Sequence, residues 1–166
     1  LTETAPFASF LTPEFSLTKL GSAGQPPMFT EMKIVDTDNK TIAAGEKGEI
    51  CISGPNIMKG YWNRPEATAE AIDTEGWFHS GDIGYLDADG FLFSCDRLKD
   101  MVISGGENVY PAEVESALFK HEAIAEVAVI GLPDEKWGEA VTAIAALYKD
   151  QTLTLEELRE FAGPLL

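Results

Sequence analysis

The sequence predicts an α+β protein in which a small barrel-like sheet is followed by a compact lobe of helices and strands. Residues 28–54 alternate between apolar and polar positions with the period of two that is typical of strands. Residues 82–96 place two apolar runs on either side of Asp89-Gly90, a pair that is favoured in tight hairpin turns. Beyond about residue 98 the pattern changes, and helices and strands alternate.

The first part of the chain predicts two strands and a short helix before the hairpin. The stretch MFTEMKIVD (28–36) reads as one strand and GEICISG (48–54) as the next, with Asn39 and Gly45 supplying turn signals between them. Pro65 stands where the first turn of a helix tolerates proline, and Ala and Glu residues follow it.

The second part predicts, in order, a helix over 110–121, strands over 124–132 and 140–149, and a helix over 152–163. Thr154 and Glu157 form the capping-box pattern at the start of the last helix. The change in pattern indicates a boundary within 96–100, so we expect one domain over residues 1–97 and a second over residues 98–166.

Composition and charge narrow the class of protein. The chain has 45% apolar and 24% charged residues, which is typical of a globular protein, and no apolar run approaches the roughly 20 residues of a membrane helix. The formal charge of −16 argues against a nucleic-acid surface. Cys51 and Cys95 stand outside any CxxC pattern and are expected as reduced thiols, and no secretory signal opens the chain, so we expect a cytoplasmic location.

Both ends of the sequence indicate a piece of a longer protein. The chain opens in what reads as a loop without an initiator Met, and it closes on FAGPLL a few residues into a predicted helix.

The sequence gives little support for a metal site or for a hydrolase active site. The turns that start at Asp36 and Asp87 lack the glycine and the glutamate that a calcium loop needs at its sixth and twelfth positions. His79 and His121 are far apart without a third ligand at metal spacing, so structural or surface roles are expected, and no GxSxG elbow occurs. Core positions or packing between the lobes are expected for the tryptophans, Trp62, Trp77 and Trp137.

Five motifs in one order carry a family resemblance: LTET, GEICISGPNIMKGYWNRPEATAEAI, GWFHSGDIGYLDADGF, DRLKDMVISGGENVYPAEVE and AVIGLPDEKWGEAV. Together they resemble the acyl-CoA synthetases of the adenylate-forming superfamily. This resemblance implies a carboxylic acid substrate, ATP, Mg²⁺ and coenzyme A. The acid is first adenylated, and a thiol then displaces AMP.

The resemblance implies roles for four residues around the nucleotide. Thr2 and Glu3 match the family's Thr-Glu pair beside the phosphates, where the Glu serves catalysis by binding Mg²⁺, a hard cation that prefers oxygen ligands. Gly81-Asp82 resembles the family's ribose clamp, in which the Asp accepts hydrogen bonds from the sugar hydroxyls. Arg97 matches the arginine that approaches the ribose and phosphate.

The resemblance also implies a hinge and a second functional face. Lys99 falls where the family has the hinge residue about which the small lobe rotates between the two catalytic steps. Gly105, Gly106 and Glu107 would then line the passage for the pantetheine arm of coenzyme A, since glycine lets backbone approach a slim ligand. A tight turn without a ligand is the alternative interpretation of the two glycines.

Several alternatives stay open. The phosphate loop and most of the acyl pocket would precede Leu1, and the lysine of the adenylation step would follow Leu166, so this piece alone is expected to be inactive. A fatty-acid-type ligase is favoured, although aromatic and short branched acids remain open. A carrier-protein-loading adenylation domain is the second hypothesis. Luciferase-like oxidation is disfavoured because Ile103 stands where light-emitting members carry a second lysine. A homodimer is one of the assemblies left open.

Overall fold

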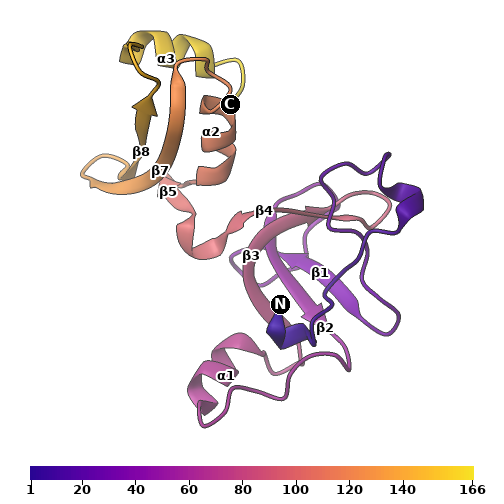
Figure 1. Cartoon of the computed structure of the whole chain (residues 1–166). Helices are drawn as coiled ribbons and strands as arrows, with labels where there is room; N and C mark the ends of the chain where they lie inside the picture. Colours follow the sequence, from indigo (N-terminus) through magenta and orange to yellow (C-terminus); the bar gives the residue numbers. More distant parts are fainter. The chain divides into compact units, whose positions relative to one another are not determined.

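The structure, a computed structural model, describes all 166 residues and has the α+β class that the sequence predicts (Figure 1). The chain folds as two units, Leu1–Leu98 and Lys99–Leu166. Each unit has a four-stranded antiparallel sheet of its own. None of the helices has the length and apolar character needed to cross a bilayer.

The first unit is built on strands β1 (Glu31–Val35), β2 (Gly48–Ser53), β3 (Phe78–Leu86) and β4 (Leu92–Arg97), with helix α1 (Pro65–Ala71) between β2 and β3. Short 3₁₀ helices cover Thr2–Thr4, Pro13–Phe15 and Leu98–Asp100. The strand order is β1-β2-β3-β4, and β1 does not pair with β4. The expected barrel-like sheet is therefore an open sheet.

One buried cluster of the first unit lies on one face of this sheet. Ile34, Ile50, Ile52 and Leu92 form this cluster, each with 5% or less of its surface exposed. These residues come from β1, β2 and β4, so alternate side chains of neighbouring strands meet on the same face, as the period of two predicts.

The predicted hairpin between β3 and β4 turns at Asp87 and Gly90. The Asp87 carboxylate accepts hydrogen bonds from the backbone N–H groups of Asp89 and Phe91, both at 2.9 Å. Gly90 has a φ of +79°, which glycine adopts without steric cost. The turn therefore fixes the register in which Leu86 pairs with Leu92 and Tyr85 with Phe93.

The second unit consists of β5 (Val102–Ser104), β6 (Glu107–Val109), α2 (Pro111–Leu118), β7 (Ile124–Asp134), β8 (Gly138–Leu147) and α3 (Leu155–Ala162), with the strand order β6-β5-β8-β7. Both helices pack on the sheet through a cluster of Leu118, Ile124, Val129 and Ala162, and Figure 1 shows α2 alongside β7. The predicted capping box is confirmed at Thr154 and Glu157.

Trp62 and Trp137 do not take core positions, which are one of the two roles expected for the tryptophans. Trp62 is 89% exposed and Trp137 is 49% exposed. Trp77 is half-buried, and the ammonium group of Lys33 lies 4.3 Å from the centre of its ring. Aromatic residue type alone therefore did not predict burial in this chain.

Replacing Ile52 by Ala tests the core of the first unit. Ile52 is 1% exposed, so we expect the free energy of unfolding to fall by about 2–5 kcal/mol because the change leaves a cavity. Urea denaturation followed by circular dichroism and tryptophan fluorescence measures the loss. The control is Leu17→Ala, since Leu17 is 84% exposed and its removal should change stability by less than about 0.5 kcal/mol. Equal losses for the two variants would contradict the assigned core.

The two thiols should differ sharply in reactivity. Burial, with a further contribution from the Glu49 charge, raises the pKa of Cys51 to about 12, whereas Cys95 is only half-buried. Because the thiolate is the reactive form, a disulfide reagent at pH 8 should modify one thiol of the native protein and two in denaturant. Cys95→Ser should abolish the native reaction, and two rapidly reacting thiols in the folded protein would contradict the burial of Cys51.

Candidate nucleotide site and junction

Thr2 and Glu3 lie in the first 3₁₀ helix, where Glu3 is held by two hydroxyl groups. Thr2 donates a hydrogen bond to one carboxylate oxygen at 2.9 Å, and Tyr61 donates to the other at 3.1 Å. The backbone N–H of Glu3 and the Thr2 hydroxyl lower the pKa of the Glu3 carboxyl, while burial and the bond to Glu3 raise the pKa of Tyr61. Glu3 is therefore an ionised carboxylate at neutral pH.

Hydrogen bonds to its carbonyl oxygens anchor this 3₁₀ helix to the loop that follows β2. The N–H of Met58 donates to the carbonyl oxygen of Glu3 at 2.8 Å. The side-chain amide of Asn56 donates to the carbonyl oxygen of Thr4 at 3.2 Å, and Thr4 is fully buried. The backbone that carries Glu3 is thus held in place by hydrogen bonds, although it lies close to the first residue of the chain.

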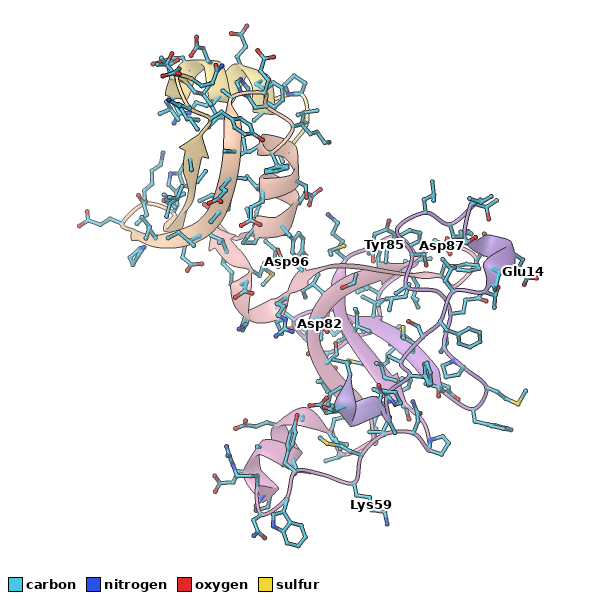
Figure 2. All side chains as sticks on the ribbon, in the orientation of Figure 1. Glu14, Lys59, Asp82, Tyr85, Asp87 and Asp96 are labelled. Atoms are coloured by element: carbon cyan, nitrogen blue, oxygen red, sulfur yellow. The ribbon has the colours of Figure 1, made fainter.

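Asp82 and Arg97 are brought together by the β3–β4 ladder. The two residues are cross-strand partners, and the Arg97 Nε atom lies 3.6 Å from an Asp82 carboxylate oxygen. The Asp82 side chain is 25% exposed and that of Arg97 is 64% exposed; Figure 2 shows Asp82 on β3. This exposure leaves both side chains accessible to a ligand.

The segment before Asp82 departs from a regular strand. Gly81 has a φ of +70°, and the N–H of Asp82 donates to the Ser80 hydroxyl at 3.1 Å. Asp82 keeps its partner Arg97 on β4 but has no partner on β2, and irregularities of this kind often redirect a side chain. The geometry is suited to presenting Asp82 as a hydrogen-bond acceptor.

Lys99 lies at the junction between the two units. It is exposed and sits in the 3₁₀ helix Leu98–Asp100, and the division into units falls between Leu98 and Lys99. The regular pairing of β4 ends at Arg97, and β5 begins at Val102.

Gly105 and Gly106 form the turn of the short β5–β6 hairpin. Their φ values of +62° and +88° match the two positive values that a type I′ hairpin turn requires. A Cβ atom on Gly105 would also lie 2.8 Å from the Trp137 ring, so glycine is needed there for space as well. Glu107 is the exposed first residue of β6. The two glycines therefore form a tight turn, which is compatible both with a ligand role and with a turn that binds no ligand.

The predicted residues thus fall into separate groups. Asp82 and Arg97 contact each other, whereas no hydrogen bond or ion pair joins them to Glu3. Lys99 and the 105–107 turn belong to the second unit. An apolar groove of about 520 Å³ adjoins the first 3₁₀ helix, and none of the predicted site residues lines it. Its lining is Thr4, Ala5, Phe7, Phe10, Pro27, Met28, Thr30, Pro55 and Asn56.

Glu49, Cys51 and His79 form a cluster that the sequence analysis missed. Their potential ligand atoms lie within 4.8 Å of one another, although 28 residues separate Cys51 from His79 in the sequence. The His79 Nδ1 atom lies 2.8 Å from a Glu49 oxygen, which is shorter than the roughly 3.3 Å between two ligands of a tetrahedral zinc ion. A hydrogen bond between the two side chains accounts for this distance without a metal.

Comparisons with known proteins assign the family. The profile described as "AMP-binding enzyme" matches residues 1–62, and the profile described as "AMP-binding enzyme C-terminal domain" matches residues 113–164. A 2-succinylbenzoate–CoA ligase from a Geobacillus species is 50% identical over 97% of this chain and 32% of its own length. The long-chain-fatty-acid–CoA ligase FadD13 of Mycobacterium tuberculosis is 48% identical over 100% of this chain and 32% of its own length.

Solved structures of o-succinylbenzoate CoA synthetase from Bacillus subtilis are similar as well. The complex with its acyl-adenylate intermediate aligns with a TM-score of 0.86 at 45% identity, over 100% of this chain and 34% of that one. The complex with ATP and a magnesium ion aligns with a TM-score of 0.83 at 44% identity, with the same coverage. The chain spans about a third of the length of these relatives. The resemblance inferred from the motifs is confirmed, and the chain belongs to the AMP-binding enzyme family, together with the acyl-CoA ligases.

Proposed function

We propose that this chain is part of a longer protein that acts as an ATP-dependent, AMP-forming acid:CoA ligase. The observation that carries the proposal is that the two ligases described above, aligned over 97–100% of the chain at 50% and 48% identity, are CoA ligases. In the proposed reaction the substrate carboxylate attacks the α-phosphate of ATP and releases pyrophosphate. The thiol of coenzyme A then attacks the acyl carbon, and AMP leaves. Adenylation is needed because a carboxylate is a poor electrophile with a poor leaving group.

In the first step we assign Asp82 and Arg97 to the nucleotide. The Asp82 carboxylate accepts hydrogen bonds from the ribose hydroxyls, and the guanidinium of Arg97 approaches the ribose and phosphate. Their 3.6 Å separation and their exposure support this assignment, because one ligand can reach both groups. The arginine is always charged and offers several donors in a fixed plane, which suits phosphate oxygens.

Glu3 fits a magnesium ion by charge and by remaining acceptor capacity. Its carboxylate is ionised, and each oxygen accepts one hydroxyl hydrogen bond, which leaves lone pairs for a hard cation. When bound there together with the nucleotide phosphates, Mg²⁺ would neutralise charge on the transferring group. Thr2 keeps the carboxylate oriented for this role.

The second step requires a change at the junction. We assign the hinge to Lys99 and the pantetheine passage to Gly105, Gly106 and Glu107, with residues 1–97 as part of the large domain and 98–166 as part of the mobile lobe. The division of the fold between Leu98 and Lys99 supports the hinge. The turn at the two glycines is exposed and carries no side chain, so a ligand can approach its backbone. This supports the assignment of the pantetheine passage.

The acyl group is the least constrained part of the proposal. We take a fatty acid as the first candidate and a succinylbenzoate-like aromatic acid as the second, because relatives of both kinds align at similar identity. The two cysteines, neither of which is in a disulfide, suit a reducing compartment, and a cytoplasmic location belongs to the same proposal.

The full-length protein tests the proposal directly. It should exchange pyrophosphate into ATP in the presence of a suitable acid and should form an acyl-CoA from free coenzyme A, while the 166-residue chain alone should do neither. A panel of fatty and aromatic acids separates the two substrate candidates. Transfer to a holo-carrier protein without any reaction on free coenzyme A would instead favour a carrier-loading adenylation domain.

Lys99→Pro tests the hinge. Proline fixes φ near about −65°, so the junction can no longer change its backbone angles at this position. We expect pyrophosphate exchange to stay nearly intact, while acyl-CoA formation falls by about tenfold or more. Lys99→Ala, which keeps backbone freedom, should retain most of both activities. Equal losses in the two half-reactions of the proline variant would show that Lys99 is not the pivot.

Asp82→Ala tests the ribose contact. Loss of the hydrogen bonds to the sugar should weaken ATP binding by about 1–3 kcal/mol in calorimetric titrations of the full-length protein. Asp38→Ala is the matched control, since the Asp38 side chain is 72% exposed in the turn between β1 and β2 and should not affect the nucleotide. An unchanged ATP dissociation constant for Asp82→Ala would discredit the assignment.

A further inference from the structure

The pairing between β2 and β3 is interrupted just before Asp82. Glu49 pairs with Ile83 and Cys51 pairs with His79, so two steps along β2 correspond to four along β3. The residues of β3 between these pairs, Ser80 to Asp82, form a bulge against β2. A bulge of this kind redirects the side chains that it carries.

Glu49 fills the inner side of this bulge. One of its carboxylate oxygens accepts a hydrogen bond from the N–H of Gly81 at 3.0 Å, and the other lies 2.8 Å from the His79 Nδ1 atom. Its side chain is only 15% exposed. Both oxygens are therefore committed to residues of β3 on either side of Ser80, and a mostly buried carboxylate bridges the bulge.

The contacts continue from His79 to the turn that precedes β3. The His79 Nε2 atom lies 3.6 Å from an Asp73 carboxylate oxygen. The other Asp73 oxygen accepts hydrogen bonds from the N–H groups of Glu75 and Trp77, at 2.9 and 2.8 Å. Glu49 is thus held by a ring that is itself oriented by the Asp73 turn.

We propose that Glu49 is a positioning residue for the ribose contact: by holding the N–H of Gly81 it fixes the direction of the Asp82 carboxylate. This inference rests on the proposed function, in which Asp82 binds the ribose. Glu49 itself is not expected to touch the nucleotide. Its effect passes through Gly81, whose φ of +70° is one of several conformations that glycine adopts at similar cost, so the hydrogen bond to Glu49 selects one of them.

A purely structural role is the competing explanation, and it makes a different prediction. If Glu49 only stabilised the sheet, its loss would lower the melting temperature and would affect all ligands alike. If it positions Asp82, its loss acts on the part of the nucleotide that Asp82 contacts, namely the ribose hydroxyls.

The experiment uses the full-length protein with ATP and its 2′-deoxy and 3′-deoxy analogues. For Glu49→Gln we expect KM for ATP to rise about five- to tenfold, as for one weakened hydrogen bond, with KM for the acid unchanged and the melting temperature nearly unchanged. The loss of affinity on removing a ribose hydroxyl should be large in the wild type and small in Glu49→Gln. Glu46→Gln is the matched control, because Glu46 also accepts a backbone N–H, that of Ala43, in a turn remote from Asp82 in the sequence.

The outcomes separate the two proposals. An equal deoxy penalty in wild type and Glu49→Gln would overturn the positioning role. A wild-type enzyme without any deoxy penalty would overturn the ribose assignment of Asp82, on which the inference rests.

Gly81→Ala provides a second variant if Glu49→Gln lowers the melting temperature sharply. No atom lies within 4 Å of a Cβ built at Gly81, so this change disturbs backbone conformation without a clash. It should show the same reduced deoxy penalty, whereas Gly21→Ala, at a φ of +82° and equally open, should not. A normal deoxy penalty in Gly81→Ala would likewise overturn the inference.

Discussion

The hydrogen bond that Glu49 accepts from the Gly81 N–H holds the bulge before Asp82, and the proposed nucleotide site depends on it. Without it, the bulge in β3 would leave a backbone donor unpaired in a half-buried position, which costs free energy. The bulge is also what takes Asp82 out of the β2 ladder while keeping it in register with Arg97 on β4. The Glu49 carboxylate thus stabilises the bulge in β3, while Asp82 stays paired with β4 and remains accessible as an acceptor.

Two separate cores are compatible with the proposed hinge at the junction. Ile34, Ile50, Ile52 and Leu92 bury one another in the first unit, and a second cluster around Ile124 and Val129 does so in the second. Since each sheet has its own apolar cluster, a change of backbone angles near Lys99 need not break either one. A hinge function requires this independence, because hinge residues absorb the change while the packed parts stay rigid.

The sequence predicted the longer elements well because their signals are local, whereas it did not predict the three-residue strands β5 and β6. The Thr154 capping box, Pro65 and the Asp89-Gly90 turn each mark an element within a few residues, and the structure has an element at each place. The bulges could not be predicted, because they depend on which residue of another strand lies opposite. Glu49 was missed for the same reason: it stands 32 residues before Gly81 in a stretch that reads only as a strand.

Burial was harder to predict than secondary structure. The apolar run from Ile124 to Leu132 indicates a strand, and β7 contains it, yet Ile130 and Leu132 are more than 40% exposed. Helices α2 and α3 contribute to a single cluster that includes Ile124 and Val129, and a run of apolar residues does not show whether one or both faces of a strand are covered. Trp62 shows the same limit for a single aromatic residue.

The chain has a formal charge of −16, and its acidic groups repel the phosphates of a nucleotide. The proposed ATP site must therefore limit this repulsion locally. In the Asp82–Arg97 pair, the positive charge of the arginine reduces this repulsion. The guanidinium lies against one carboxylate oxygen at 3.6 Å, so it offsets the charge of Asp82 and leaves the other oxygen to accept from a hydroxyl group. The Glu3 carboxylate is held instead by the neutral hydroxyls of Thr2 and Tyr61. Such a carboxylate keeps its full negative charge and repels phosphates when no cation is present. A divalent ion between the carboxylate and the phosphates turns this repulsion into attraction. The contrast between the two acidic residues therefore supports the proposed assignment of Asp82 to the sugar and of Glu3 to the metal.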